Sequence, residues 1–320
     1  MKVLDLNCNS ADIYFKLKFE IPEKSRLEQK INHIVDNVLF LSSKEYPKKC
    51  KYSITVCDVK KFPDIDSIKY SSRKVFKNAD NLIIQIFLSE YDYYVFAYKG
   101  KKLNHVRHIE VSHDKTILIK EYYRDYIHTE TDILNGLLLN FGLAHGYFGY
   151  GLLHSCGFII NNEAYLILGN SGEGKSTLIK SLLDHGILNK SDILGDERVL
   201  LSFNKVNPSA ILCKPFNIIR SNITTYSKFF SVKRFFILKR GEHNLIKRID
   251  IDEIKSFILE DKANSFFKRL VFPQSLGLYD KFVKRIKEMG DIGCFILSVK
   301  EEYYNDSSLV RYLYDEIRSI

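Results

Sequence analysis

The sequence is poor in several residue types that mark particular classes of protein. Its 320 residues include no tryptophan, two methionines and six prolines. No proline-rich, low-complexity or repeated segment is present, so the composition is not that of a disordered chain. Hydrophobic residues make up 45% of the sequence, which is enough for a substantial core.

Metal-binding and disulfide patterns are also missing. The six cysteines are scattered and form no CxxC pair. Their spacing therefore gives neither a zinc motif nor the disulfide framework of a small secreted domain. The four histidines between residues 105 and 128 are loosely spaced and predict no metal site. With no signal-peptide pattern at the N-terminus, we expect a reducing, cytoplasmic location.

Charged residues are absent from residues 133–162. A membrane-spanning helix needs about 20 mostly apolar residues. This segment instead contains Asn135, Asn140 and His145, together with several glycines. We therefore expect a buried helix over residues 130–144 followed by a glycine-rich crossing, and no membrane span.

The formal net charge is +9, and the basic residues occur in short groups. No basic run is long enough to indicate nucleic acid as a partner. A basic surface around a phosphate-binding site is the simpler interpretation, because such a surface attracts anions. The oligomeric state is left open.

The chain length predicts two domains. An N-terminal α+β domain is expected over residues 1–129, with an amphipathic helix over residues 26–42 and short, aromatic, largely antiparallel strands. It contains no group of residues typical of a catalytic site. A second, α/β domain is expected over residues 130–320.

The second domain is organised around a glycine-rich loop. Residues 169–177 fit the phosphate-binding pattern G-x-x-x-x-G-K-[ST] without a mismatch. An apolar strand over residues 164–168 precedes the loop and a helical pattern follows it, which is the context that the motif requires. Glycines let the backbone turn sharply and approach a ligand, and the loop N–H groups with the helix N-terminus favour an anion.

The loop therefore predicts binding of a nucleoside triphosphate. Lys175 would supply a positive charge to the outer phosphates, and the Ser176 hydroxyl is suited to Mg²⁺. The predicted nucleotide-binding residues are Gly169, Asn170, Ser171, Gly172, Glu173, Gly174, Lys175, Ser176 and Thr177.

The strand that enters this loop is predicted to be half of an antiparallel hairpin. Residues 152–160 and 163–168 form the two strands, and Asn161-Asn162 suits a type I′ turn because asparagine tolerates positive φ. Ordinary nucleotide switches enter the loop from a parallel sheet. The hairpin therefore indicates a different subclass.

A pair of acids follows the loop. Asp196 and Glu197 interrupt a predicted strand over residues 193–203. Acids in a buried strand cost stability unless a metal or cation pairs with them. Their position suits Mg²⁺ ligands or a base near the γ-phosphate, although an exposed pair at a strand end would fit the same pattern.

Taken in order, these segments resemble the HPr kinase/phosphorylase-like P-loop kinases, which share a phosphate-loop type with phosphoenolpyruvate carboxykinase. The matching segments are Leu153-His154-Ser155, the hairpin over residues 157–168, the loop over 169–177, and residues 194–201. Residues 237–241 and 294–299 are similar to members associated with small-peptide modification. The resemblance covers about residues 130–300.

The resemblance implies ATP- and Mg²⁺-dependent phosphate transfer to a hydroxyl, usually that of serine in a small protein, a ribosomally made peptide or free serine. Lys175 would hold the β- and γ-phosphates, and Ser176 and Glu197 would bind the metal. Asp196 would be the base toward the acceptor hydroxyl, with His154 beside the transferred phosphate. The N-terminal half is matched only by its general position, so its role is left open, with acceptor recognition as one interpretation.

The chain departs from the family pattern in the acidic pair. Glu197 stands where the family usually has aspartate, and a gapless alignment would place Asp192 at the position of the base. We assign Asp196, because residues 199–201 then fit the strand that follows. The loop also contains an acid, Glu173, for which the pattern offers no role.

The phosphate-contacting arginine of the family is not fixed by the pattern, and Arg220 and Arg240 are the candidates. Two other functional classes are considered. Residues 189–192 match the guanine-reading motif N-K-x-D of GTPases, but they lie too close to the loop to serve that role. A catalytically silent nucleotide-binding partner remains open, because a fold and a loop alone do not fix a function.

Overall fold

The chain divides into two compact units, and each is described separately. The first unit is residues 1–144 with 273–276, and the second is residues 145–272 with 277–320. The predicted helix over residues 26–42 lies outside the described residues. The computed structural model describes residues 2–10, 13–22, 52–59, 61–77, 82–89, 92–99, 101–112, 116–124, 133, 136–137, 140–141, 150–170, 172–195, 198–203, 211–215, 229–260, 278–290 and 292–320.

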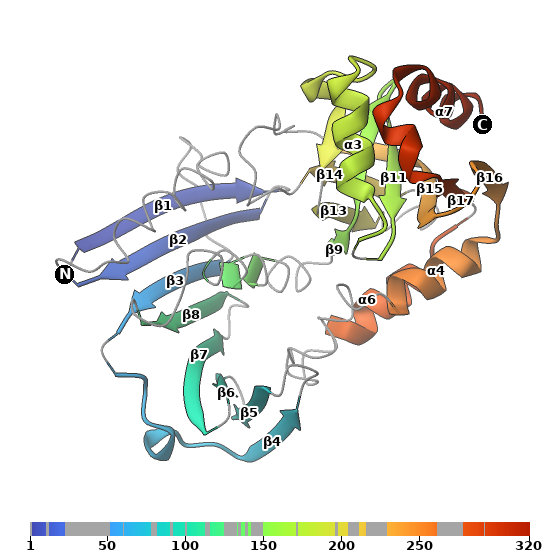
Figure 1. Cartoon of the computed structure of the whole chain (residues 1–320). Coiled ribbons are helices and arrows are strands. Elements are labelled where there is room, and N and C mark those ends of the chain that lie inside the picture. Colours follow the sequence, from blue (N-terminus) through green and yellow to red (C-terminus); the bar gives the residue numbers. More distant parts are fainter. Residues whose placement is uncertain are drawn as a thin grey trace. The chain divides into compact units, whose positions relative to one another are not determined.

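The first unit contains an eight-stranded sheet in the order β1-β2-β3-β8-β7-β6-β5-β4 (Figure 1). The pairs β2–β3 and β3–β8 are parallel, and the other pairs are antiparallel. The predicted aromatic and β-branched strands are present, because alternate apolar side chains can be buried on one face. The strands are β1 Lys2–Ser10, β2 Ile13–Ile21, β3 Tyr52–Asp58, β4 Ser72–Lys77, β5 Leu82–Leu88, β6 Asp92–Lys99, β7 Lys102–Val111 and β8 Ile117–Tyr123, and a short 3₁₀ helix, η2, spans Ile65–Ser67.

The boundary between the units lies after residue 144, whereas the sequence placed it between residues 129 and 130. The described residues between 133 and 141 are helical, and they pack within the first unit. Phe141 is fully buried and meets the ring of Phe15 edge-on, with 5.2 Å between the ring centroids. Asn140 donates a 2.7 Å hydrogen bond to Glu121 of β8. Apolar packing and this bond tie the segment to the N-terminal sheet, which helical periodicity alone cannot reveal.

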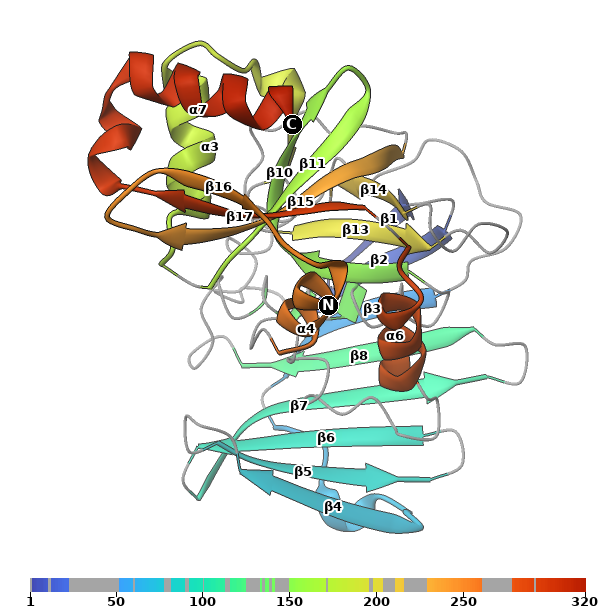
Figure 2. The same ribbon diagram turned by 90° about the vertical axis from the view of Figure 1, so that its right-hand side faces the viewer.

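The second unit contains a nine-stranded sheet with the path β12-β10-β11-β15-β14-β13-β9, to which β17 adds beside β15 and β16 beside β17 (Figure 2). The pairs β11–β15 and β15–β17 are parallel, and the other pairs are antiparallel. The strands are β9 Tyr150–His154, β10 Cys156–Ile160, β11 Glu163–Leu168, β12 Ile193–Gly195, β13 Arg198–Phe203, β14 Ile211–Pro215, β15 Phe230–Arg240, β16 Leu245–Arg248 and β17 Gly293–Val299.

Helices cover both faces of this second sheet. Side chains from α3 and α7 share one core with Tyr165 and Ile167 of β11. Side chains from α4 and α6 share another core with Leu166 and Leu168. Because successive strand residues point to opposite faces, one strand serves both cores and the unit is a mixed α/β structure. The helices are α3 Lys175–Asp184, α4 Ile251–Glu260, α6 Leu278–Lys287 and α7 Ser307–Ser319, with short 3₁₀ helices η3 Lys190–Asp192 and η5 Glu301–Asn305.

The predicted hairpin is confirmed. Strands β10 and β11 are antiparallel, and the turn residues Asn161 and Asn162 have φ angles of 52° and 66°. These positive values at both central positions are those of a type I′ turn, whose twist matches that of the flanking strands.

Two longer predicted strands are each divided in the structure. Residues 152–160 form the end of β9 and all of β10, which are separated at the buried Ser155. Residues 193–203 form β12 and β13, which pair with different neighbours: β12 with β10, and β13 with β9 and β14. Pairing partners far away in the sequence decide these breaks. Among the helices of the described residues, none is long and apolar enough to cross a membrane.

Candidate functional site

The glycine loop connects the end of β11 to the start of α3, as the motif predicts. Gly172 and Gly174 have φ angles of 88° and 96°, in the left-handed region where L residues with a Cβ are strained. Gly174 is the N-cap of α3 and provides no side-chain cap. The first N–H groups of the helix therefore receive no hydrogen bond from a cap side chain, which is the arrangement that favours an anion.

Lys175 is the first residue of α3, and its side chain curls back over the loop. It is 7% exposed, and its Nζ donates to the carbonyl oxygens of Gly169 at 2.5 Å and Asn170 at 3.1 Å. The ammonium group is thus held beside the loop by weak, neutral acceptors. Phosphate oxygens would be stronger acceptors for the same donors, because charge-assisted hydrogen bonds are about twice as strong as neutral ones. Ser176 and Thr177 are exposed on the first turn of α3, and Ser171 lies outside the described residues.

Glu173 now has a structural role. Its Oε2 accepts a 2.8 Å hydrogen bond from the backbone N–H of Arg240, at the end of β15. The acid therefore joins the loop to the neighbouring strand. The Arg240 guanidinium lies 3.5 Å from Glu301, in an exposed ion pair. No sequence pattern predicts the bond between Glu173 and Arg240, because its donor is a backbone group 67 residues away.

Tyr304, in η5, is a site residue that the sequence did not indicate. A Cβ built on Gly174 would lie 3.0 Å from its hydroxyl oxygen and 3.4 Å from its Cζ. The side chain is buried, and burial raises the pKa of Tyr304 to about 12. Within the described residues its hydroxyl has no hydrogen-bond partner. Tyr304 therefore packs against the loop and occupies the space that a side chain on residue 174 would need.

His154 ends β9, and its cross-strand neighbour is Arg198 at the start of β13. Two residues further on, the Sγ of Cys156 lies 3.6 Å from the carbonyl oxygen of Lys175, to which it donates. The chain from β9 into β10 therefore passes beside the base of the loop helix. Asp196 and Glu197 lie outside the described residues, so the predicted base and the second metal ligand stay predictions.

The N-K-x-D segment has a local structural explanation. The backbone N–H and the side-chain amide of Asn189 donate to Asp192 Oδ2 at 2.8 Å and 3.1 Å. These bonds form a capping box around η3. The residues that match the guanine motif thus stabilise a short surface turn. The same bonds occupy Asp192, the residue that a gapless alignment would place as base.

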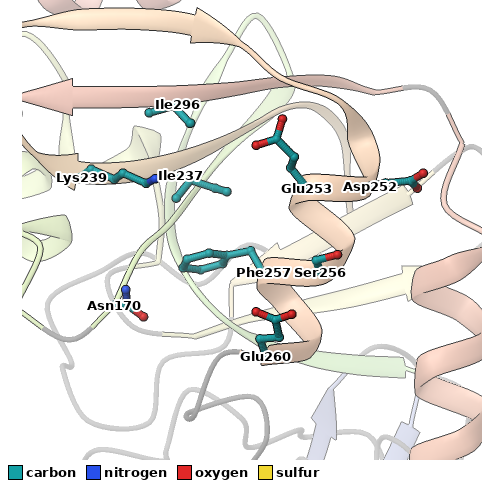
Figure 3. A pocket seen from close by; sticks show the side chains of 9 residues that line it. All are labelled: Asn170, Ile237, Lys239, Asp252, Glu253, Ser256, Phe257, Glu260 and Ile296. Atoms are coloured by element: carbon teal, nitrogen blue, oxygen red, sulfur yellow. The ribbon is translucent and has the colours of Figure 1, made fainter.

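A pocket with a volume of about 560 Å³ lies beside the start of the loop, between α4 and the strands β15 and β17 (Figure 3). Its apolar part is formed by Ile237, Ile296 and Phe257. Its polar rim combines several acidic side chains with Lys239 and the loop residue Asn170. The lining residues are Asn170, Ile237, Lys239, Asp252, Glu253, Ser256, Phe257, Glu260 and Ile296.

Among the described residues of the first unit, one group of side chains has metal-ligand chemistry. His108 Nε2 lies 2.9 Å from Asp92 Oδ1, and Glu110 offers a third atom, with all three within 4.8 Å of one another. The His108 ring also stacks on Tyr94, with 4.1 Å between the ring centroids. The hydrogen-bond contact with Asp92 and the stacking on Tyr94 account for the position of His108 without a metal.

No family model matches the chain, and no curated protein matches it either. The functional argument therefore rests on the residues and their geometry. The loop, the lysine that curls over it and the adjacent pocket all belong to the second unit.

Proposed function

We propose that this chain is an ATP- and Mg²⁺-dependent phosphotransferase of the HPr kinase-like type, acting on a hydroxyl, most simply that of serine in a small protein or peptide. The observation that carries the proposal is the loop itself. Left-handed glycines, an uncapped helix N-terminus and a lysine held by carbonyl groups form an anion-binding site directly after an antiparallel hairpin.

The proposed mechanism is positioning combined with charge neutralisation, because phosphoryl transfer requires little covalent chemistry from the protein. Lys175 exchanges the carbonyl oxygens of Gly169 and Asn170 for oxygens of the β- and γ-phosphates. Ser176 and Glu197 would hold Mg²⁺, which would supply positive charge to neutralise that of the phosphates.

Asp196 accepts the proton of the acceptor hydroxyl in the proposed transfer. The acceptor oxygen forms its bond to the γ-phosphorus while the bond from that phosphorus to ADP breaks. His154 lies beside the transferred group in this scheme. A positioned base of this kind contributes about 10²- to 10⁴-fold in rate.

Nucleotide binding is tested first, by calorimetry with Mg·ATP. Lys175→Met removes the charge at the loop and is expected to abolish measurable binding. Lys180→Met is the matched control, because Lys180 is an exposed lysine on the same helix α3. Equal affinity of the two variants for Mg·ATP would contradict the proposed site.

Transfer is tested by incubating the protein with ATP, Mg²⁺ and serine peptides, small proteins or free serine, and weighing the products. A mass increase of one phosphate on serine is expected, and Asp196→Asn should abolish it while ATP still binds. Transfer that persists in Asp196→Asn would refute the assigned base. ATP binding without transfer to any acceptor would identify a catalytically silent nucleotide-binding protein.

A further inference from the structure

The pocket beside the loop is acidic, although the chain as a whole carries a net charge of +9. We propose that this pocket binds the cationic side chain of a basic peptide acceptor, a lysine or arginine close to the serine that receives the phosphate. This inference rests on the proposed function, because it names the acceptor of that same site. The side chains that line the pocket are shown in Figure 3.

One stripe of helix α4 faces the pocket. Glu253, Phe257 and Glu260 are spaced at i, i+4 and i+7, so they lie on the same side of the helix. Ile254 and Ile258 are fully buried in the core beneath the sheet, which fixes the rotation of α4. In Figure 3, Phe257 projects from the helix toward the strand side, with Glu253 above it and Glu260 below it.

Within the described residues neither glutamate side chain makes a hydrogen bond or an ion pair, and Lys239 is the one basic residue beside the three acids that line the pocket. Asp252 also lines the pocket, but its carboxylate already pairs with Lys255 at 3.0 Å. An acid in the first turn of a helix stabilises the helix dipole, which accounts for Glu253 in part. Glu260 lies at the other end, where the dipole opposes a negative charge. Helix stability therefore does not explain Glu260.

The lining suits a long cationic side chain. Ile237, Ile296 and Phe257 can cover an apolar stem, while the carboxylates of Glu253 and Glu260 reach a charged head at the rim. The Phe257 ring adds a face on which an ammonium or guanidinium group is attracted. A volume of about 560 Å³ also leaves room for neighbouring peptide backbone.

The same acids disfavour the triphosphate in this pocket, because like charges repel at short range. The nucleotide is therefore directed to the loop N–H groups and Lys175, and the pocket is left for the other reactant. Asn170 belongs both to the loop and to the pocket lining. A cation bound there would hold its peptide directly beside the transferred phosphate, which is the positioning that this reaction requires.

The experiment uses a peptide library with one fixed serine and every flanking position varied, incubated with the full chain and Mg·ATP. Phosphorylated peptides are expected to be enriched in lysine or arginine at a defined distance from the serine. For the best basic peptide, the double variant Glu253→Gln/Glu260→Gln should lower kcat/KM about tenfold, because each exposed ion pair that is lost contributes about threefold. Its KM for ATP should not change.

The matched control is Asp315→Asn/Glu316→Gln, which removes two exposed acids from α7 on the opposite face of the sheet. It should leave the peptide preference unchanged. A charge reversal, Glu253→Lys/Glu260→Lys, should shift the preference toward acidic peptides. All these positions are exposed, so the fold should be retained.

A second measurement separates this inference from the proposed function. Fluorescent copies of the basic peptides of the library, with serine replaced by alanine, are titrated into the protein with ADP present. In one outcome, no acceptor is phosphorylated, while one basic probe from the library binds and loses affinity in Glu253→Gln/Glu260→Gln. That result would support the pocket as a site for a basic peptide and contradict the proposed kinase activity. If neither transfer nor pocket-dependent binding occurs, both fail.

Three results would overturn the pocket while the kinase activity stands. One is transfer without any preference for basic flanking residues. Another is a double variant whose affinity for ATP falls while its peptide preference stays, since the pocket would then hold the nucleoside. The third is transfer to free serine only, with a KM for serine raised in Glu253→Gln/Glu260→Gln, which would identify the amino group of serine as the bound cation.

Discussion

Replacement of Gly174 by alanine should separate two contributions to the loop geometry, the backbone angle and the space beside Tyr304. Gly174 has a φ angle of 96°. An L residue in the left-handed region costs about 1–2 kcal/mol, and the stiffer unfolded chain of alanine returns about 0.4–1 kcal/mol. The backbone alone therefore predicts a loss of about 1 kcal/mol.

The packing contribution comes from the Cβ, which would lie 3.0 Å from the hydroxyl oxygen of the buried Tyr304. Forcing extra volume into a packed site costs about 1–3 kcal/mol. Gly174→Ala should therefore lose about 2–4 kcal/mol in all, which is about 30- to 1,000-fold in affinity for Mg·ATP if the loop must keep its conformation to bind. Calorimetry with Mg·ATP and thermal unfolding without nucleotide measure the two effects.

Two other glycines provide matched controls. Gly172 and Gly186 have φ angles of 88° and 65°, and a Cβ on either meets nothing within 4 Å. Gly172→Ala, in the loop, should lose only the backbone contribution of about 1 kcal/mol. Gly186→Ala, beyond the end of α3, should lower stability by a similar amount and leave the affinity for ATP unchanged.

The contact itself is tested with Tyr304→Phe, which removes the hydroxyl at 3.0 Å but keeps the ring carbon Cζ at 3.4 Å. In the Gly174→Ala background it should recover about 1 kcal/mol of the loss, which is part of the packing contribution. If Gly174→Ala binds Mg·ATP as well as the wild type, the left-handed loop geometry is not needed for binding and the reasoning is refuted. If it loses no more than Gly172→Ala, the contact with Tyr304 has no energetic effect.

Substitutions at three further positions test individual contacts. Glu173→Ala should weaken Mg·ATP binding, because the loop loses its hydrogen bond to β15. Glu173→Gln keeps an acceptor for the Arg240 N–H and should bind Mg·ATP at least as well as the wild type. The reverse order of affinities in calorimetry would contradict a role for this hydrogen bond in binding. Burial raises the pKa of Glu121, but Arg107 and His105 outweigh it and hold the pKa at about 2, so the unfolded chain takes up the proton first as pH falls. The stabilisation of the fold by the Glu121 carboxylate is therefore complete above pH 4.5 and is lost as the pH falls from about 4.5 toward 2. Glu121→Gln leaves Arg107 buried without its charge partner, so it should lower the free energy of unfolding by about 3–5 kcal/mol near neutral pH. In urea titrations this loss should become progressively smaller over the same acid range. Asn162 has a φ angle of 66°, so Asn162→Ala should lower the free energy of unfolding by about 1 kcal/mol, whereas Asn162→Gly should not. An equal loss in both variants would argue against the type I′ turn.

Much of the local structure follows from the sequence because its causes are local. The turn at Asn161-Asn162 and the loop between β11 and α3 depend on φ preferences and on short-range apolar patterns, and both were predicted in place. The division of residues 193–203 into β12 and β13 was not predicted, because it depends on the strands with which each part pairs. Likewise, the helical residues near Phe141 belong to the first unit through packing against Phe15.

The candidate site divides in the same way. The loop between β11 and α3 could be predicted from the chain pattern, since the motif Gly169–Thr177 specifies its own glycines, lysine and helix start. Only the tertiary structure brought Tyr304 against Gly174, tied Glu173 to the backbone of Arg240, and placed the acids of α4 in a pocket beside Asn170. These contacts join residues that lie 67 to 130 positions apart in the sequence. A local sequence pattern does not predict such contacts, because only the folded sheet and its two helical layers bring these residues together.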